Sequence, residues 1–262
     1  MTKKTEKKSV VYVSGESPMV ETYADLCAEK GYEVFVSWNK EPVDRPKGAS
    51  PIKKSSGGPP PSTVIAIELT NTDGDQKRKN IERIDKALSP TAPILSSSVT
   101  ITATEQSSWV KHKHRLVGIC ALPSLIEAPT VEVAPTIHSP KETIDVVLRF
   151  YQSLGKEAEI VQDRIGMVVP RILCQLINES AFALMEEVAS PLDIDTAMKL
   201  GVNYPNGPIE WAEKIGLSQV YAVLSALESD LREDRYRIAP LLRQMSVTGE
   251  WWKTKTQTKD HS

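Results

Sequence analysis

The chain has 262 residues, of which 40% are hydrophobic and 25% are charged, and its formal net charge at pH 7 is −2. This length allows two domains of ordinary size or one large one, and the near balance of charge gives no reason to expect nucleic acid or an anionic membrane as a partner. No apolar run reaches the roughly 18–20 residues of a membrane-spanning helix, and no apolar region follows the Lys-rich start as in a signal peptide, so we expect a cytoplasmic protein.

The cysteines Cys27, Cys120 and Cys174 are odd in number and have no close spacing. Such a pattern suggests neither a disulfide framework nor a zinc site. We therefore expect reduced, mostly buried thiols and no metal.

The first elements read as a β-α-β unit. The run VVYVSG, Val10 to Gly15, is rich in β-branched residues and ends at glycine, and apolar residues recur at helical spacing between Met19 and Cys27. Gly31 ends that helix, and the next run, YEVFVSW, has the composition of a second strand. Dinucleotide-binding sheets are built on this unit.

The segment from Asn39 to Ser62 departs from that plan, because its prolines and glycines are too dense for a helix and its polar residues offer no apolar face. We expect a loop or linker. Further strands are predicted at Val64–Leu69, around Pro93–Ser97, at Arg115–Cys120 and at Thr130–Pro135, with a charged helix after the first of them.

Strands that alternate with helices indicate a mostly parallel sheet covered on both faces. Ser139-Pro140 opens the next helix, Lys141 to Leu154, and marks the expected hinge between domains 1–137 and 138–262. Beyond it the chain is nearly all helical. One long apolar stripe, typical of an interior helix, contains Ile172, Leu173, Leu176, Ile177, Leu184, Met185 and Val188.

The stretch from Asp163 to Gly216, DRIGMVVPRILCQLINESAFALMEEVASPLDIDTAMKLGVNYPNGPIEWAEKIG, closely resembles the signature helices of the 3-hydroxyacyl-CoA dehydrogenase family. Members of this family oxidise a β-hydroxy thioester with NAD and belong to fatty acid metabolism. The resemblance is close over the second half of the chain and looser over the first. It implies a Rossmann-like, mostly parallel α/β domain followed by an all-α helical dimerisation domain, and a homodimer formed through the helical domain.

The resemblance also locates the cofactor positions. A Rossmann phosphate loop uses three glycines, but here the equivalent stretch is GESPMV, which keeps only Gly15. Ser17 places a side chain where the pyrophosphate approaches, Val20 pushes the helix off the strand, and Glu16 adds a carboxylate beside any bound phosphate. Pro18 removes one N–H group that a helix N-terminus offers to an anion.

An NAD-binding unit normally ends its second strand in an acidic residue that holds the adenine ribose. The alignment places Trp38 there, and an indole accepts no hydrogen bond from a ribose hydroxyl. Lys77 matches a lysine of the family that contacts the cofactor, although a lysine on an exposed helix is more often only a solvated charge. From these residues we expect NAD binding to be weak or lost.

The catalytic positions are also substituted. The family uses a histidine in the motif H-F-F-N-P, where this chain has CALPS and so offers Cys120, while the glutamate of its V-E-V motif is present as Glu132. The family's serine aligns with Val99, beside Thr100, and its asparagine aligns with Pro170. Losing a general base alone typically costs about 10²–10⁴-fold in rate.

Three hypotheses about function remain open from the sequence. The favoured one is a diverged, catalytically impaired homologue, a pseudoenzyme, that acts as a dimer and binds an acyl-CoA-like ligand or a partner protein. The alternative is an active NAD-dependent oxidoreductase with a relocated base, acting on a 3-hydroxyacyl-CoA or a related hydroxyacid derivative. A third hypothesis makes the helical domain an assembly module only.

Overall fold

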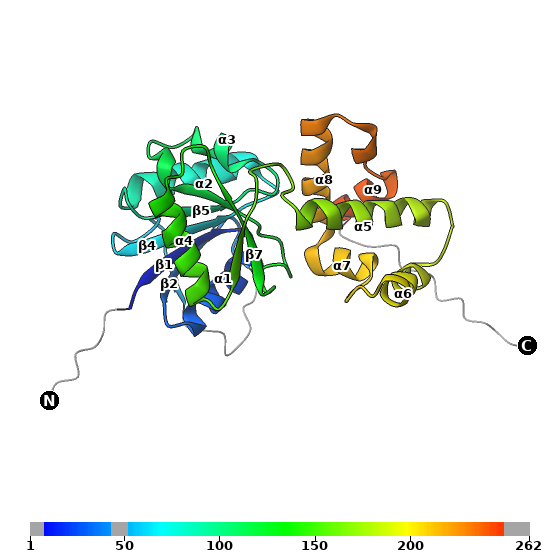
Figure 1. The fold of residues 1–262 in the computed structure, drawn as a ribbon, viewed down its shortest axis with the longest axis horizontal. Helices are drawn as coiled ribbons and strands as arrows, with labels where there is room; N and C mark the ends of the chain where they lie inside the picture. The colour runs from blue at the N-terminus through cyan, green and yellow to red at the C-terminus, as the bar shows by residue number, and fades with distance from the viewer. Residues whose placement is uncertain (1–7, 43–51, 249–262) are drawn as a thin grey trace, which may run out of the picture. The chain divides into compact units, whose positions relative to one another are not determined.

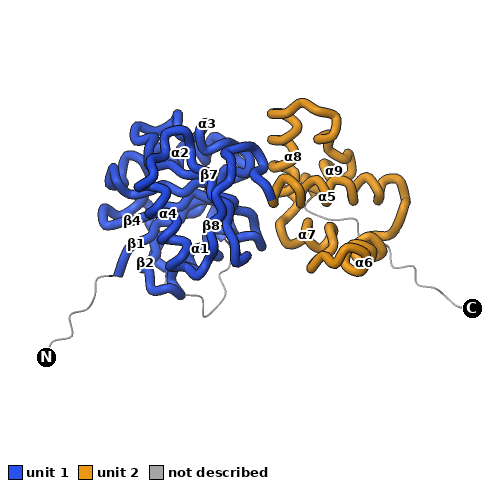
Figure 2. Tube along the Cα trace, viewed as in Figure 1, with its two compact units in different colours: residues 1–168 blue, residues 169–262 orange. Residues whose placement is uncertain are grey.

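The structure is a computed structural model that describes residues 8–42 and 52–248 (Figure 1). It divides into two compact units, Met1–Val168 and Val169–Ser262 (Figure 2). Unit 1 contains the sheet, and the described part of unit 2 contains helices and no strand. The expected fold class, a Rossmann-like α/β domain followed by an all-α domain, is therefore confirmed.

The described part of unit 1 contains one sheet with the strand order β3-β2-β1-β4-β5-β6-β7-β8. Its strands are β1 Val10–Gly15, β2 Glu33–Trp38, β3 Ile52–Lys54, β4 Thr63–Leu69, β5 Ile94–Ser97, β6 Leu116–Ile119, β7 Thr130–Pro135 and β8 Glu157–Ile160. Only β6 and β7 pair antiparallel, and all other neighbours are parallel. The order around β1 is that of a dinucleotide-binding sheet.

Helices cover both faces of this sheet because successive side chains of each strand point to opposite sides. Val11 and Val13 of β1 pack in a core with α1 (Met19–Glu29) and α4 (Lys141–Ser153). Tyr12 packs on the other face, which α2 covers. The elements on that side are α2 (Gly74–Ala87), α3 (Ala103–Ser107) and the short η1 (Lys113–Arg115).

The segment 39–62, expected to be a loop or linker, is only partly one. Residues 43–51 lie outside the described residues, but Ile52–Lys54 form the edge strand β3, which pairs parallel with β2. Ile52 packs against the core below it, and two lysines follow on the exposed edge. Lysines on an edge strand oppose pairing with other chains. A three-residue strand is too short to be seen in the sequence pattern.

The boundary between the units lies after Val168 and not at the expected position 137/138. The helix α4 belongs to the sheet, because Val147, Phe150 and Tyr151 are buried in the core of unit 1. The following strand β8, which the sequence did not predict, pairs parallel with β7.

Unit 2 consists, in its described part, of α5 (Val169–Met185), α6 (Pro191–Val202), α7 (Pro208–Ile215), α8 (Leu217–Leu231), the short η2 (Asp234–Tyr236) and α9 (Pro240–Thr248). The buried face of α5 includes Leu173 and Ile177, as expected. Ile172, Met185 and Val188 of the predicted stripe are exposed instead. In the described residues no helix has the length and apolar character needed to cross a membrane.

Candidate active site

The loops expected to form the site meet at one edge of the sheet. β1, β4, β5 and β6 run parallel, so their carboxyl ends and the loops that follow lie along the same edge (Figure 1). In open α/β sheets, ligands bind outside this edge. The structure thus brings the predicted phosphate loop, the segment after β5 and the start of the CALPS segment to one edge of unit 1.

The turn after β1 requires a glycine. Gly15 has a φ of +134°, and a Cβ atom there would lie 2.6 Å from the backbone carbon of Leu69. The peptide bond between Ser17 and Pro18 is cis, and α1 begins directly afterwards at Met19. The Ser17 hydroxyl is exposed and donates to Oε1 of Glu21 at 2.9 Å. The tight turn of a dinucleotide loop is therefore present without its later glycines.

Glu16 links this loop to the loop after β4. Its Oε1 accepts hydrogen bonds from the backbone N–H of Thr72 at 2.9 Å and from the Thr72 hydroxyl at 2.6 Å. The carboxylate expected to repel a phosphate is thus held in place across the edge of the sheet. A fixed negative charge here opposes a bound pyrophosphate.

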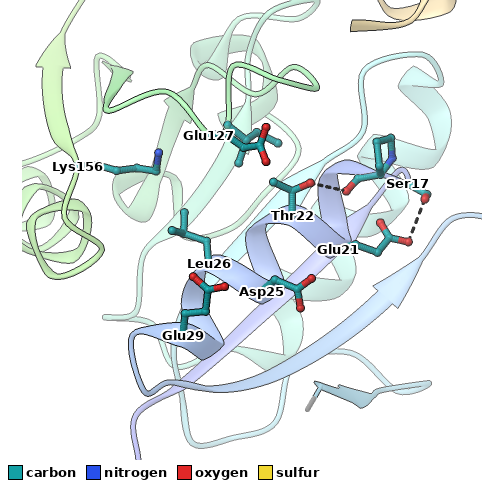
Figure 3. Close-up of a pocket in the computed structure, with 10 residues that line it drawn as sticks. Ser17, Glu21, Thr22, Asp25, Leu26, Glu29, Glu127 and Lys156 are labelled. Carbon is teal, nitrogen blue, oxygen red and sulfur yellow. Dashed lines mark hydrogen bonds between the residues drawn. The ribbon is translucent and has the colours of Figure 1, made fainter. Parts of the chain in front are cut away.

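A cavity of about 580 Å³ runs along α1 beside the same loop (Figure 3). Its α1 side carries the carboxylates of Glu21, Asp25 and Glu29, and Lys156 lies across from them. Burial lowers the pKa of Lys156. A cavity with this charge does not suit the phosphates of a dinucleotide, so we do not place the cofactor in it.

Strand β2 itself ends without a carboxylate, but Glu21 of α1 brings one to that position. The Trp38 indole donates to Oε1 of Glu21 at 3.0 Å. The next residue, Asn39, is exposed and donates to the Thr70 hydroxyl at 2.8 Å, while its own amide oxygen accepts from Asn80. The turn at Gly15 therefore fits a dinucleotide, and the carboxylate beside the end of β2 comes from α1 and not from the strand.

Lys77 is not the solvated charge that an exposed helix would give. Its side chain is 1% exposed, and its ammonium nitrogen lies 2.7 Å from Oε2 of Glu68 and 2.7 Å from the carbonyl oxygen of Thr70. Sequence reasoning did not single out Glu68, because it stands inside the apolar strand TVIAIEL. An acidic residue within an apolar strand could have indicated a buried ion pair, since buried charges require partners.

The structure joins Cys120 and Glu132 through their backbones. Cys120 follows β6 directly and Glu132 lies on β7, and the backbone N–H of Cys120 donates to the carbonyl oxygen of Glu132 at 3.0 Å. Both residues are buried. Oε2 of Glu132 accepts a hydrogen bond from the backbone N–H of Val168 at 2.8 Å. The carboxylate is therefore held in a defined position.

Cys120 also interacts electrostatically with two buried tyrosines. The hydroxyls of Tyr23 and Tyr151 lie 3.2 Å apart, and burial raises the pKa of both, with a smaller contribution from Cys120. The histidines in the described residues lie elsewhere. His112 on the other side of the sheet contacts Asp85 at 3.2 Å, for example.

The remaining catalytic positions offer little to a substrate oxygen. Val99 is fully buried, and its carbonyl oxygen accepts from the backbone N–H of Gly166. Thr100 is half-buried and donates to the carbonyl oxygen of Asn71 at 3.1 Å. Pro170 lies in the first turn of α5, in unit 2.

Sequence reasoning missed Asn71. This buried residue follows β4, and its amide donates to the carbonyl oxygen of Ala121 at 2.9 Å. It thereby connects the loop after β4 to the segment after β6. A polar residue directly after a buried strand was the only signal in the sequence. Among the described residues, no group of His, Cys, Asp or Glu forms a cluster suited to a metal ion.

Comparison with known proteins gives consistent matches over both units. Residues 62–164 match the family model described as 3-hydroxyacyl-CoA dehydrogenase, NAD binding domain, and residues 166–258 match the model of its C-terminal domain. A probable 3-hydroxybutyryl-CoA dehydrogenase of Deinococcus radiodurans is 30% identical over 90% of this chain and 94% of its own length. A 3-hydroxybutyryl-CoA dehydrogenase of Bradyrhizobium diazoefficiens is 31% identical over 74% of this chain.

The matched part covers 66% of the Bradyrhizobium protein, slightly less than two thirds of its length. Among solved structures, (S)-3-hydroxybutyryl-CoA dehydrogenase PaaH1 of Ralstonia eutropha has a TM-score of 0.76 and 27% identity, covering 93% of this chain and 95% of that one. FadB2 of M. tuberculosis has a TM-score of 0.78 at 20% identity over the same shares, which supports the fold alone.

Proposed function

Because the chain belongs to the 3-hydroxyacyl-CoA dehydrogenase family, we propose that it is a working oxidoreductase that acts on a 3-hydroxyacyl-CoA or a related hydroxyacid derivative. One observation supports the proposal most directly. Gly15, Cys120 and Glu132 all lie at the edge of the unit 1 sheet where β1 and β6 end, and ligands bind at this edge in open α/β sheets. The relatives are named as dehydrogenases, which favours this function over the impaired homologue expected from the substitutions.

The roles follow from the contacts. A nicotinamide adenine dinucleotide, when bound, supplies the site that accepts or donates hydride. In this proposal Cys120 takes the hydroxyl proton in place of the family's histidine, and the carboxylate of Glu132, fixed by the Val168 backbone, assists it. Thr100 follows Val99 in the chain and is the residue that we assign to the serine's role, although its hydroxyl donates to the Asn71 carbonyl oxygen in the structure. Because a histidine base is replaced, we expect a rate about 10²–10⁴-fold below that of relatives that keep one.

A second candidate keeps the binding function without turnover. It is favoured by the fully buried, hydroxyl-free Val99 and by the fixed carboxylate of Glu16 in the phosphate loop. In this version the chain is a dimeric, catalytically impaired homologue that binds an acyl-CoA-like ligand or a partner protein. Catalytic residues that act as a unit are not rescued one at a time, so the absence of both the histidine and the serine side chains favours this version.

We also propose a homodimer formed through unit 2. Its helices α5 and α6 leave large apolar side chains in solvent, namely Ile172, Leu192, Leu200 and Val202, and Leu200 is 82% exposed. A group of exposed apolar side chains on one domain is typical of an interface. A symmetric dimer would bury the same face on both copies.

The test is calorimetric titration with NADH and with NADPH, followed by a turnover assay with acetoacetyl-CoA. Saturable binding of one dinucleotide and slow oxidation of it on addition of the thioester are expected. The matched variant is Glu132→Gln, which keeps the shape and removes the charge, and it should lower turnover and leave dinucleotide affinity unchanged. Binding without any turnover would select the second candidate, and absence of binding would reject the oxidoreductase.

A further inference from the structure

The end of β2 meets the first turn of α1 beside the dinucleotide turn. Trp38 pairs with Gly15 across the two strands, and its indole N–H donates to Oε1 of Glu21, in the first turn of α1, at 3.0 Å. A dinucleotide fold uses an acidic residue at the end of this strand to bind the adenosine ribose. Here the strand lacks the acid, and the helix brings a carboxylate to the same place.

The carboxylate of Glu21 is held on one oxygen only. Besides the Trp38 indole, the exposed Ser17 hydroxyl donates to Oε1 at 2.9 Å (Figure 3). The other oxygen, Oε2, is buried and has no hydrogen-bond partner among the described residues. A carboxylate accepts about four hydrogen bonds, and a buried acceptor without a donor is costly, so Oε2 favours a ligand that brings hydroxyl donors.

A ribose diol fits this acceptor. The Glu21 side chain as a whole is half-buried, and the torsion at its carboxylate is broad, so a rotation presents Oε2 to a ligand. The two hydroxyls of a ribose are neutral donors. The carboxylates along α1, which oppose the phosphates of a dinucleotide, therefore do not oppose its ribose.

The charge at the end of β2 favours a free diol over a 2′-phosphate. Arg83, on α2, reaches the strand through Asn80, because its Nη2 donates to the Asn80 oxygen at 3.3 Å and the Asn80 amide donates to Asn39 at 2.8 Å. The charge in direct contact with Trp38 is instead the negative one of Glu21. A phosphate on the adenosine 2′-oxygen would be repelled by it.

We propose that Glu21 binds the adenosine ribose of NAD in place of the acid missing from the end of β2, with Ser17 and Trp38 holding its carboxylate. This rests on the proposed function and assigns a specificity-determining residue to its cofactor site. Trp38 then orients the acid instead of removing it, since an indole donates a hydrogen bond and accepts none. The substitution that had predicted weak binding of NAD is thereby offset by a residue of α1.

The test uses the full chain and measures binding by titration calorimetry. The unaltered chain should bind NADH at least about tenfold more tightly than NADPH, and 5′-ADP more tightly than 2′-deoxy-5′-ADP. Glu21→Gln should weaken NADH binding about tenfold, the loss expected for one charge-assisted contact, and should leave NADPH unchanged or tighter. The variant should also no longer distinguish 5′-ADP from its 2′-deoxy form.

Two further variants separate a contact with the ribose from a general effect. Asp25→Asn removes a carboxylate that lies one turn further along α1 and lines the same cavity, and as the matched control it should leave the ratio of the NADH and NADPH affinities unchanged. Trp38→Phe keeps an aromatic ring and removes the donor that holds Glu21, so it should weaken NADH binding less than Glu21→Gln does.

The ratio of the two affinities also guards against a folding defect, because a disturbed α1 would weaken both dinucleotides alike. Equal losses for NADH and NADPH in Glu21→Gln would mean that Glu21 is only structural, which overturns this inference. Unchanged NADH binding in that variant, or tighter NADPH binding by the unaltered chain, would also overturn it and leave the oxidoreductase intact. Failure of both dinucleotides to bind the unaltered chain would reject both proposals.

Discussion

The ammonium nitrogen of Lys77 lies 2.7 Å from Oε2 of Glu68, and both side chains are buried between α2 and β4. Glu68 also accepts hydrogen bonds from the backbone N–H of Thr70 and from the Asn80 amide. A pair satisfied in this way holds α2 to the sheet at the edge where the cofactor is expected. Breaking the pair of Lys77 and Glu68 should therefore lower the stability of the fold.

We expect Lys77→Met to lower the free energy of unfolding by about 3–5 kcal/mol, because the Glu68 carboxylate would remain buried without its cation. Urea unfolding followed by circular dichroism measures the change. Lys79→Met, an exposed position on the same helix, is the control and should stay within about 0.5 kcal/mol of the unaltered chain. A loss for Lys77→Met no larger than that of the control would contradict the interpretation.

Glu16→Gln should increase dinucleotide affinity. The amide keeps an acceptor for Thr72 and removes the negative charge from the phosphate loop. Coulomb repulsion between a carboxylate and a phosphate a few ångströms apart in water amounts to about 1 kcal/mol, which corresponds to roughly fivefold in the dissociation constant. Calorimetry at low salt measures it, with Glu29→Gln at the far end of α1 as the control. Unchanged or weaker binding would mean that Glu16 does not face the phosphates.

Cys120→His alone should leave turnover within about tenfold of the unaltered chain. The histidine would follow β6 beside Glu132, but Val99 still supplies no hydroxyl, and positioning groups act together with the base. Steady-state kinetics with acetoacetyl-CoA measures the effect. A rise of two orders of magnitude would show that the rest of the site is competent and that the base alone was missing.

Leu200→Glu should convert the proposed dimer to a monomer, because a charge on the apolar face of α6 must be desolvated on association. Light scattering at micromolar concentration reports the mass. The matched control is Ile137→Glu in unit 1, since Ile137 is also 82% exposed and lies outside the proposed interface. A monomeric unaltered chain, or a dimer that tolerates Leu200→Glu and is lost with Ile137→Glu, would reject an interface on unit 2.

Asp85 should make stability depend on pH. Burial alone would raise the pKa of Asp85, but hydrogen bonds from Arg115 and from the Lys111 backbone, with the charge of Arg115, outweigh it and lower the pKa. A carboxyl with a lowered folded-state pKa stabilises the fold above its unfolded value of about 3.9 and loses this contribution as the pH falls through the folded value.

Asp85→Asn should therefore cost about 1.5–3 kcal/mol at neutral pH, and the cost should shrink below about pH 4. Thermal unfolding at a series of pH values measures it. Asp75→Asn, exposed near the start of the same helix, is the control. A cost that stays constant down to acid pH would show that the ionised form of Asp85 is not what stabilises the contact with Arg115.

The β-α-β opening and the helical second half were predictable because they depend on local pattern. A β-branched run that ends at Gly15 and a helical spacing of apolar residues do not require knowledge of distant parts of the chain. The resemblance implied a pair formed by Cys120 and Glu132, and the structure joins the two residues through a backbone hydrogen bond. The edge strand β3 and the strand β8 were not predictable, because a short polar segment becomes a strand only when a partner edge is beside it.

The sequence by itself determined the alternation of strands and helices, the helical second half and the side chains present at each position of the site. Only the tertiary structure decided what those side chains contact. Lys77 is an interior cation because β4 places Glu68 opposite it, and Glu16 is fixed because the loop after β4 brings Thr72 to it. Arg83 reaches the end of β2 through Asn80 in the same way. Such partners lie far apart in the sequence, and which of them meet depends on the order of strands in the sheet, which local periodicity does not encode.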